Sequence, residues 1–183
     1  MSEELIIRHC SPTLAGLKTG NLFSCSYESK EILNNDLRKL NRKLSSKGLR
    51  VLPLRISDQK ALIYLYRPAR LREDLMAEKA VTLLKDRGYS WEYPNRCIVS
   101  LISRLHSTTD FPHEIGLFLG YPPEDVQGFI ENGAQESKVS GCWKVYGDEE
   151  SAKKTFEKYK KCTHEYTERL INCNTLEQLA VAI

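Results

Sequence analysis

The sequence has no apolar run long enough to cross a membrane as a helix. Its first ten residues, MSEELIIRHC, place acidic residues before a short apolar patch, which is the wrong order for a secretory signal peptide. The chain also contains no internal repeat and no low-complexity segment. We therefore expect a globular protein of the cytoplasm that does not enter the membrane.

Several well-known chemical motifs are missing. The six cysteines are scattered and form no C-x-x-C pair, so in the cytoplasm we expect them to be mostly free thiols. There is no G-x-G-x-x-G and no P-loop, which removes any sequence support for nucleotide binding. The zincin signature H-E-x-x-H fails because Gly116 and Leu117 follow the His113-Glu114 pair. The sequence therefore identifies no cofactor.

Composition and charge limit the number of domains and the kinds of partner that the protein can have. The chain has 183 residues, of which 41% are hydrophobic and 28% charged, so it fits a single domain over residues 1–183. The net charge is only +3, although 30–55 holds eight basic residues and 110–137 holds six acidic and no basic ones. This pattern fits two solvated faces or a basic surface for an anionic partner. We expect no nucleic-acid partner, because no aromatic residue interrupts the basic run to stack on bases.

Periodicity and breakers predict a mixed α+β fold. Near the beginning of the chain, they indicate a strand, a helix, a hairpin and a second helix over 21–26, 29–47, 50–56 with 60–66, and 70–87. Later segments indicate three helices, one strand, a long helix from Asp148 and a short docking helix over 94–106, 110–120, 122–133, 142–146 and 175–183. Pro53 predicts an edge strand. We expect a small, mainly antiparallel sheet, also compatible with a ferredoxin-like split β-α-β order, with a helical insertion over 94–133.

Cys10 is the first candidate for chemistry. It precedes Pro12, which suits the first position of a helix, and His9 and Lys18 are near in sequence. A thiol at a helix start beside basic groups favours the thiolate, which is a nucleophile or soft metal ligand. The alternative is a cysteine that is only packed in the fold. A single cysteine does not decide between these two interpretations.

His113 and Glu114 are the second candidate. Phe111 and Pro112 are expected to hold them in the first turn of a helix, where the helix end favours a neutral imidazole and an ionised carboxylate. Such a pair suits a general base or a metal ligand. The alternative is that Glu114 caps the helix and His113 packs. Nearby glycines at positions 116, 120 and 128 are expected to let backbones approach closely.

A third candidate is the predicted strand at 142–146. Alternation along a strand places Lys144 and Tyr146 on one face and Trp143 on the other. This is either ordinary alternation of core and surface or one wall of a pocket against the His113 helix. In the second case Trp143, Lys144 and Tyr146 are ligand-binding residues.

Three motifs together resemble a known family. The segments HCSPTLAGLK, FPHEIGLFLGYPPEDV and GCWKVYGD, spread over nearly the whole chain, are similar to an uncharacterised domain-of-unknown-function family found mainly in anaerobic clostridial-type bacteria. The resemblance implies a single small cytoplasmic domain. It implies no activity, cofactor or catalytic residue.

Two functional hypotheses follow, with a structural or assembly role as a third. The favoured one is a regulatory or binding domain that holds a small molecule or a metal ion in a pocket around His113 and Trp143; the mixed set of His9, Cys10, His113 and Glu114 matches no strong zinc pattern. The alternative is a thiol-dependent enzyme with Cys10 as nucleophile or redox thiol, His113 as base, Glu114 orienting it and Lys18 as anion partner.

Overall fold

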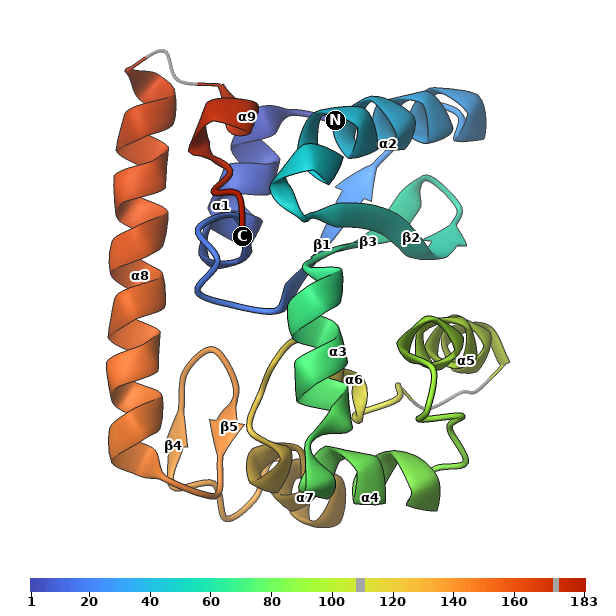
Figure 1. Cartoon of the computed structure of the whole chain (residues 1–183), viewed down its shortest axis with the longest axis vertical. Helices are drawn as coiled ribbons and strands as arrows, with labels where there is room; N and C mark the ends of the chain where they lie inside the picture. The colour runs from blue at the N-terminus through green and yellow to red at the C-terminus, as the bar shows by residue number, and fades with distance from the viewer. Residues whose placement is uncertain (108–110, 173–174) are drawn as a thin grey trace. The chain divides into compact units, whose positions relative to one another are not determined.

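The computed structural model describes residues 1–107, 111–172 and 175–183, and it shows an α+β protein (Figure 1). The first part of the chain forms α1 (Glu3–Leu14), β1 (Gly20–Ser26), α2 (Lys30–Leu44), the 3-10 helix η1 (Ser45–Lys47), β2 (Arg50–Ser57) and β3 (Lys60–Tyr66). The rest forms α3 (Pro68–Met76), α4 (Glu78–Asp86), α5 (Pro94–Ser107), α6 (Ile115–Phe118), α7 (Pro123–Asn132), β4 (Val139–Ser140), β5 (Lys144–Val145), α8 (Glu149–Ile171) and α9 (Leu176–Leu179). The expected fold class is confirmed.

The main sheet is small and antiparallel. Its strand order is β1-β3-β2, with β3 antiparallel to both neighbours. The chain therefore goes from β1 through α2 to β2, and β3 then fills the space between them, which is the split β-α-β arrangement. A complete ferredoxin-like sheet has a fourth strand, whereas this sheet has three in the described residues. Pro53 lies in the edge strand β2, as predicted, and the register shifts between Pro53 and Arg55.

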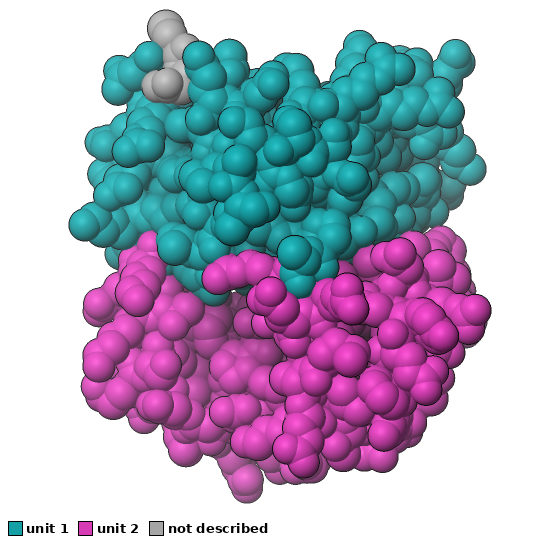
Figure 2. All heavy atoms as spheres, viewed as in Figure 1, with its two compact units in different colours: residues 1–69, 159–183 teal, residues 70–158 magenta. Residues whose placement is uncertain are grey.

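The chain divides into two compact units (Figure 2). Unit 1 consists of 1–69 and 159–183, and unit 2 consists of 70–158. Unit 2 thus covers more of the sequence than the segment 94–133, for which we expected an insertion. Helix α8 begins in unit 2 and ends in unit 1. A single folding domain and an insertion at 94–133 both stay predictions.

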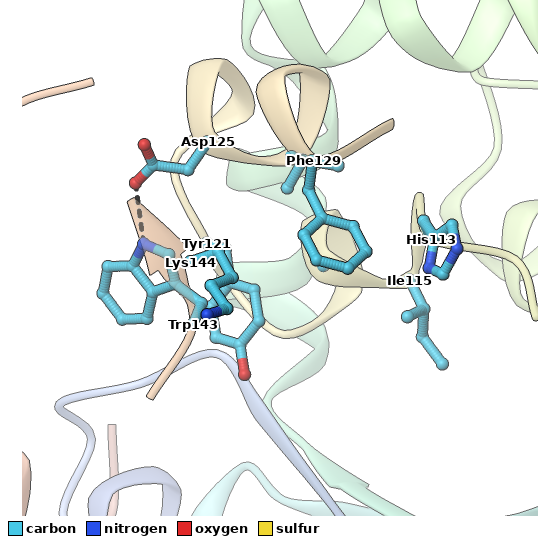
Figure 3. A pocket seen from close by; sticks show the side chains of 9 residues that line it. His113, Ile115, Tyr121, Asp125, Phe129, Trp143 and Lys144 are labelled. Atoms are coloured by element: carbon cyan, nitrogen blue, oxygen red, sulfur yellow. Dashed lines mark hydrogen bonds between the residues drawn. The ribbon is translucent and has the colours of Figure 1, made fainter. Parts of the chain in front are cut away.

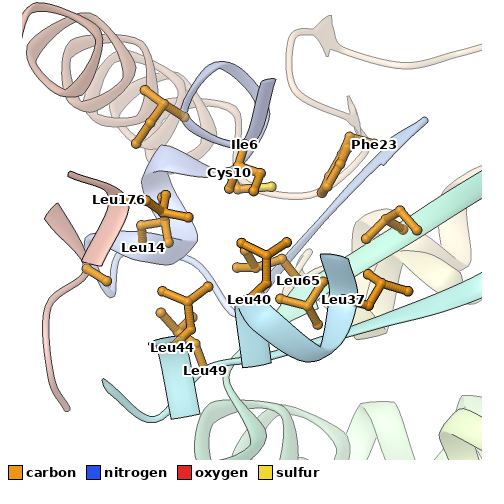
Figure 4. Packing of buried hydrophobic residues seen from close by; sticks show 14 of the residues in the cluster. Ile6, Cys10, Leu14, Phe23, Leu37, Leu40, Leu44, Leu49, Leu65 and Leu176 are labelled. Atoms are coloured by element: carbon orange, nitrogen blue, oxygen red, sulfur yellow. The ribbon is translucent and has the colours of Figure 1, made fainter. Parts of the chain in front are cut away.

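Unit 1 has a core between its sheet and its helices (Figure 4). Alternate residues of the strands, including Phe23, Ile63 and Leu65, pack with the apolar stripes of α1 and α2. The α2 stripe is formed by Leu33, Leu37, Leu40 and Leu44, as the spacing predicted. Helix α9 adds Leu176 and Leu179 to the same cluster. The core of unit 1 is therefore built from both of its chain segments.

Helix α1 corrects one expectation. We expected a helix to begin at Pro12, but α1 begins at Glu3 and Pro12 lies inside it. Ser2 caps this helix by accepting a hydrogen bond from the Leu5 backbone, and acidic residues occupy its first turn. Cys10 is consequently in the body of a helix and not at its start.

Other expected helix boundaries agree better with the structure than the start of α1 does, and one expected helix is divided. The expected helix 70–87 is two helices, because the backbone of Ala77 is extended between α3 and α4. Asp148 accepts a hydrogen bond from the Ser151 backbone and caps α8, as predicted. Asp110, the expected start of a helix, lies outside the described residues. No described helix is both long and apolar enough to span a membrane.

Arg67 ties together three parts of unit 1. Its side chain is buried, and the guanidinium donates to the carbonyls of Thr13 and Leu14 at the end of α1. It also donates to the carbonyls of Lys47, at the end of η1, and Val181, beyond α9. A buried cation here adds donors to carbonyls at the end of α1, where each also accepts a backbone N–H, and it complements the negative end of the α1 dipole.

Candidate functional site

Unit 2 contains a cavity with a volume of about 240 Å³ (Figure 3). It lies among α6, α7 and the hairpin that β4 and β5 form. The lining residues come from three short stretches of chain and are mostly aromatic or aliphatic: His113, Ile115, Gly116, Tyr121, Asp125, Val126, Phe129, Trp143 and Lys144. The cavity therefore joins the two segments, 110–133 and 142–147, that the sequence indicated as the sides of a pocket.

Aromatic rings form much of the wall. The ring of Tyr121 stacks on Trp143, with centroids 4.8 Å apart and planes 28° apart. Phe156 of α8 supports Trp143 from another direction, edge to face, at 4.6 Å. The ring of Phe129 meets His113 edge to face, also at 4.8 Å. Offset and edge contacts of this kind stabilise aromatic clusters, so the wall is held by its own packing.

Asp125 fixes the hairpin to α7. Its side chain is buried, and one carboxylate oxygen accepts the Trp143 indole N–H at 2.7 Å. The other oxygen accepts the backbone N–H groups of Tyr146 and Gly147, both at 2.7 Å. Hydrogen bonds to a buried carboxylate are stronger than those between neutral groups. Asp125 thereby sets the position of Trp143 in the cavity wall.

Two glycines allow the close packing around the cavity. A Cβ atom on Gly116 would lie 2.7 Å from Val126 Cγ2, and a Cβ on Gly128 would lie 2.4 Å from Tyr146 Cγ. Close packing is present at these two positions, which leave no room for a side chain, but the neighbours are side chains and not the backbones that we expected. Gly120 differs: its φ is +74°, so it allows the left-handed turn after α6.

His113 and Glu114 lie in different surroundings. The expected helix start at Pro112 is wrong, since α6 begins at Ile115 and Glu114 makes no side-chain cap. His113 is exposed at the cavity, whereas Glu114 is buried and accepts a hydrogen bond from the Tyr89 hydroxyl at 2.9 Å. Burial, followed by the nearby Glu114 carboxylate, raises the pKa of Tyr89. Arg104 lies 3.9 Å from Glu114, so this carboxylate anchors the chain just before α6.

The predicted strand 142–146 is shorter than expected. Only Lys144 and Val145 form β5, and residues 141–143 are in a bend. Trp143 and Lys144 consequently both line the cavity, although strict alternation would separate them. Tyr146 is not in the lining; its ring packs on Gly128 and its hydroxyl donates to the Gly133 carbonyl. Ligand binding by Trp143, Lys144 and Tyr146 stays a prediction.

Cys10 lies in the core of unit 1, among Ile6, Phe23 and other apolar side chains (Figure 4). It has no exposed surface, and this burial raises the pKa of its thiol well above the ordinary value. Lys18 acts in the opposite direction, as expected, but has the smaller effect. The Lys18 ammonium is itself buried, 5.8 Å from the centroid of the Tyr159 ring. The catalytic roles of these residues stay predictions, and burial weighs against a Cys10 thiolate.

The described residues group no three His, Cys, Asp or Glu side chains in a way that could hold a metal ion. The mixed set of His9, Cys10, His113 and Glu114 is divided between unit 1 and unit 2, and a metal site formed by it stays a prediction. Five cysteines are free thiols, and Cys173 lies outside the described part of the chain. Cys162 belongs to the core of unit 1.

The cysteines should differ in their rates of alkylation. We expect iodoacetamide at pH 8 to modify Cys142 first, because its side chain is exposed, and Cys10 only when unit 1 unfolds. Burial raises the pKa of Cys162 to about 11, which should also slow its reaction. Mass spectrometry of peptides over a time course gives each rate, and alkylation in denaturant provides the control. Modification of native Cys10 as fast as Cys142 would contradict this order.

Sequence reasoning missed the roles of three residues at the cavity. Asp125 has the position of an ordinary acid in the first turn of a helix, whereas its bonds to the hairpin are tertiary. Tyr121 and Phe129 were not singled out. The proline pair at the start of α7 and Gly128 within it offered a signal, because together they indicate a helix that packs closely against another segment. Which segment packs there depends on the fold and not on local pattern.

The family described as "Protein of unknown function (DUF3793)" matches residues 6–180. The chain belongs to this family. The DUF3793 match confirms the expected resemblance to an uncharacterised family and assigns no reaction, ligand or partner. The expected distribution of the family among anaerobic bacteria stays an expectation. No curated protein matches the chain, and no solved structure does.

Proposed function

We propose that this protein is a binding domain whose cavity in unit 2 holds a small, flat organic molecule. The observation that carries the proposal is a preformed cavity of about 240 Å³ walled by the rings of His113, Tyr121, Phe129 and Trp143. Small-molecule sites are typically concave and mostly apolar, with few polar groups that set orientation. The lining fits that description.

The hydrogen bonds of Asp125 support the proposal. They hold the hairpin and α7 together without a ligand, so binding need not organise the wall. A preformed site loses less conformational entropy on binding than a flexible one. The thiol-dependent alternative has no comparable support, because Cys10 is fully buried in unit 1.

The test is a screen of small aromatic fragments by ligand-observed NMR, followed by Phe129→Ala. Phe129 lines the cavity and takes part in none of the Asp125 hydrogen bonds. Its truncation should therefore weaken ligand binding while the hairpin stays attached to α7. We expect the affinity of a cavity-bound fragment to fall about tenfold, as for the loss of one ring contact.

The matched control is Tyr93→Ala. This aromatic side chain also belongs to unit 2, but it is exposed and outside the cavity lining. Fragment affinity should not change in this variant. The proposal is wrong if no fragment binds, or if fragments bind wild type and Phe129→Ala equally well.

We further propose that the protein functions in the cytoplasm. The support is the state of its cysteines: Cys10, Cys25, Cys97, Cys142 and Cys162 are free. Exported proteins more often pair their cysteines, because disulfides persist in oxidising compartments. Localisation of a tagged chain by cell fractionation tests this, and its recovery outside the cytoplasm would contradict it.

A further inference from the structure

We infer that the ligand of this cavity is a small aromatic carboxylate, a flat apolar body with one singly charged group. The inference rests on the proposed ligand-binding function and adds the chemical class of the ligand. Three properties of the wall lead to it: the arrangement of its rings, the state of Lys144 and the state of Asp125.

The rings set the body of the ligand. Tyr121 and Trp143 stack at one side, and Phe129 and His113 meet edge to face at another (Figure 3). A further ring can extend such a cluster by stacked or edge contacts. The volume of about 240 Å³ is smaller than the ~300–1,000 Å³ of sites for drug-sized ligands, which favours a one-ring or two-ring compound over a dinucleotide.

Lys144 sets the charge. Its backbone is paired with Ser140 across the hairpin, which fixes the position from which its side chain reaches the cavity. Among the described residues, no carboxylate forms an ion pair with the Lys144 ammonium. Lys138, just before β4, is not in the lining, and its ammonium donates to the Gly147 carbonyl at 2.6 Å. Lys144 thus leaves one positive charge for a ligand, and one charge matches a carboxylate better than a doubly charged phosphate.

Asp125 does not offset this preference by accepting a cationic ligand. Both of its oxygens already accept hydrogen bonds from Trp143, Tyr146 and Gly147. Three of the roughly four acceptor positions of this carboxylate are therefore occupied, so a ligand ammonium could form at most one hydrogen bond there without displacing a donor that holds the hairpin to α7. The wall therefore offers a donor to an anion and no comparable acceptor to a cation.

Calorimetric titration with three matched compounds tests the inference: phenylacetate, phenylacetamide and 2-phenylethylamine. They share one body and carry a negative, a neutral and a positive group. We expect phenylacetate to bind wild type at least about tenfold more tightly than phenylacetamide, and the amine to bind more weakly than both. In Lys144→Met the acid should bind within about twofold of the amide, whose own affinity should not change.

Lys154→Met is the control for net charge, since Lys154 is an exposed residue of unit 2 outside the cavity, and it should keep the preference for the acid. Equal binding of acid and amide to wild type, or an acid preference that survives Lys144→Met, would overturn the inference. The proposed function would still hold in either case if Phe129→Ala weakened binding. If none of the three compounds binds, the carboxylate class is wrong, and the fragment screen decides separately whether the cavity binds anything.

Discussion

Replacing Arg67 with alanine should lower the free energy of unfolding by about 4 kcal/mol, because it removes four charge-assisted hydrogen bonds to backbone carbonyls at a buried position. Arg67 is 2% exposed, so water does not readily replace its guanidinium. Arg67→Lys should recover little, since a single ammonium cannot reach carbonyls that a planar fork satisfies from several directions. Urea unfolding followed by far-ultraviolet circular dichroism measures both effects.

Hydrogen exchange gives a second readout for Arg67. The Val181 amide donates to the Leu14 carbonyl, which also accepts from Arg67, so Arg67→Ala should speed its exchange. Arg55→Ala is the control, because Arg55 is an exposed residue of strand β2 in the same unit. Its effect should stay within about 0.5 kcal/mol. A loss below about 1 kcal/mol for Arg67→Ala would mean that the guanidinium does not hold these segments together.

Replacing Asp125 with alanine should lower the free energy of unfolding by about 3 kcal/mol and remove ligand binding, because three N–H donors lose a charged acceptor. Asp125→Asn should cost about half as much. Its amide oxygen can still accept from Tyr146 and Gly147, but its amino group then faces the Trp143 indole N–H, which is also a donor. Urea unfolding followed by tryptophan fluorescence suits this test, since both tryptophans belong to unit 2.

A double-mutant cycle identifies the contact responsible. Trp143→Phe removes the indole donor, so Asp125→Asn should be less damaging in that background than in wild type. Glu124→Gln provides the control, because this neighbouring acid is exposed and lies 3.9 Å from Lys79 in a surface pair. It should change stability by less than about 0.5 kcal/mol. Equal effects of Asp125→Asn in both backgrounds would show that the indole bond contributes nothing.

The sheet could be predicted from the sequence because its pattern is local. Apolar alternation and the breakers around 57–59 located β2 and β3, and Pro53 identified an edge. Helix α1 was missed for a specific reason: Pro12 suggested a helix start, while the cap at Ser2 and the acids after it were overlooked. The break at Ala77 has no local cause in the sequence, as alanine favours helices.

The candidate site was partly predictable. His113, Trp143 and Lys144 were expected to lie around one pocket, and the structure places them in the lining of one cavity. Their side-chain directions depend on packing: His113 turns to Phe129 while Glu114 turns to Tyr89. The sequence pattern of Cys10 suggested reactivity, whereas its thiol is surrounded by apolar side chains. A residue's neighbours across the fold decide its chemistry, and spacing along the chain does not give them.

The composition of unit 1 from two distant segments has a consequence during synthesis. The Leu176 backbone donates to the Glu3 carboxylate, 173 residues earlier, and α9 closes one side of the core with Leu176 and Leu179. During synthesis on the ribosome, the apolar stripes of α1 and α2 cannot be covered by α9 until residues 70–158 have been made. Residues 70–158 emerge as one continuous stretch and can collapse on their own contacts first. Helices α1 and α2 are synthesised first and are therefore exposed longest in the nascent chain. We expect them to be the part of the chain that a chaperone would bind.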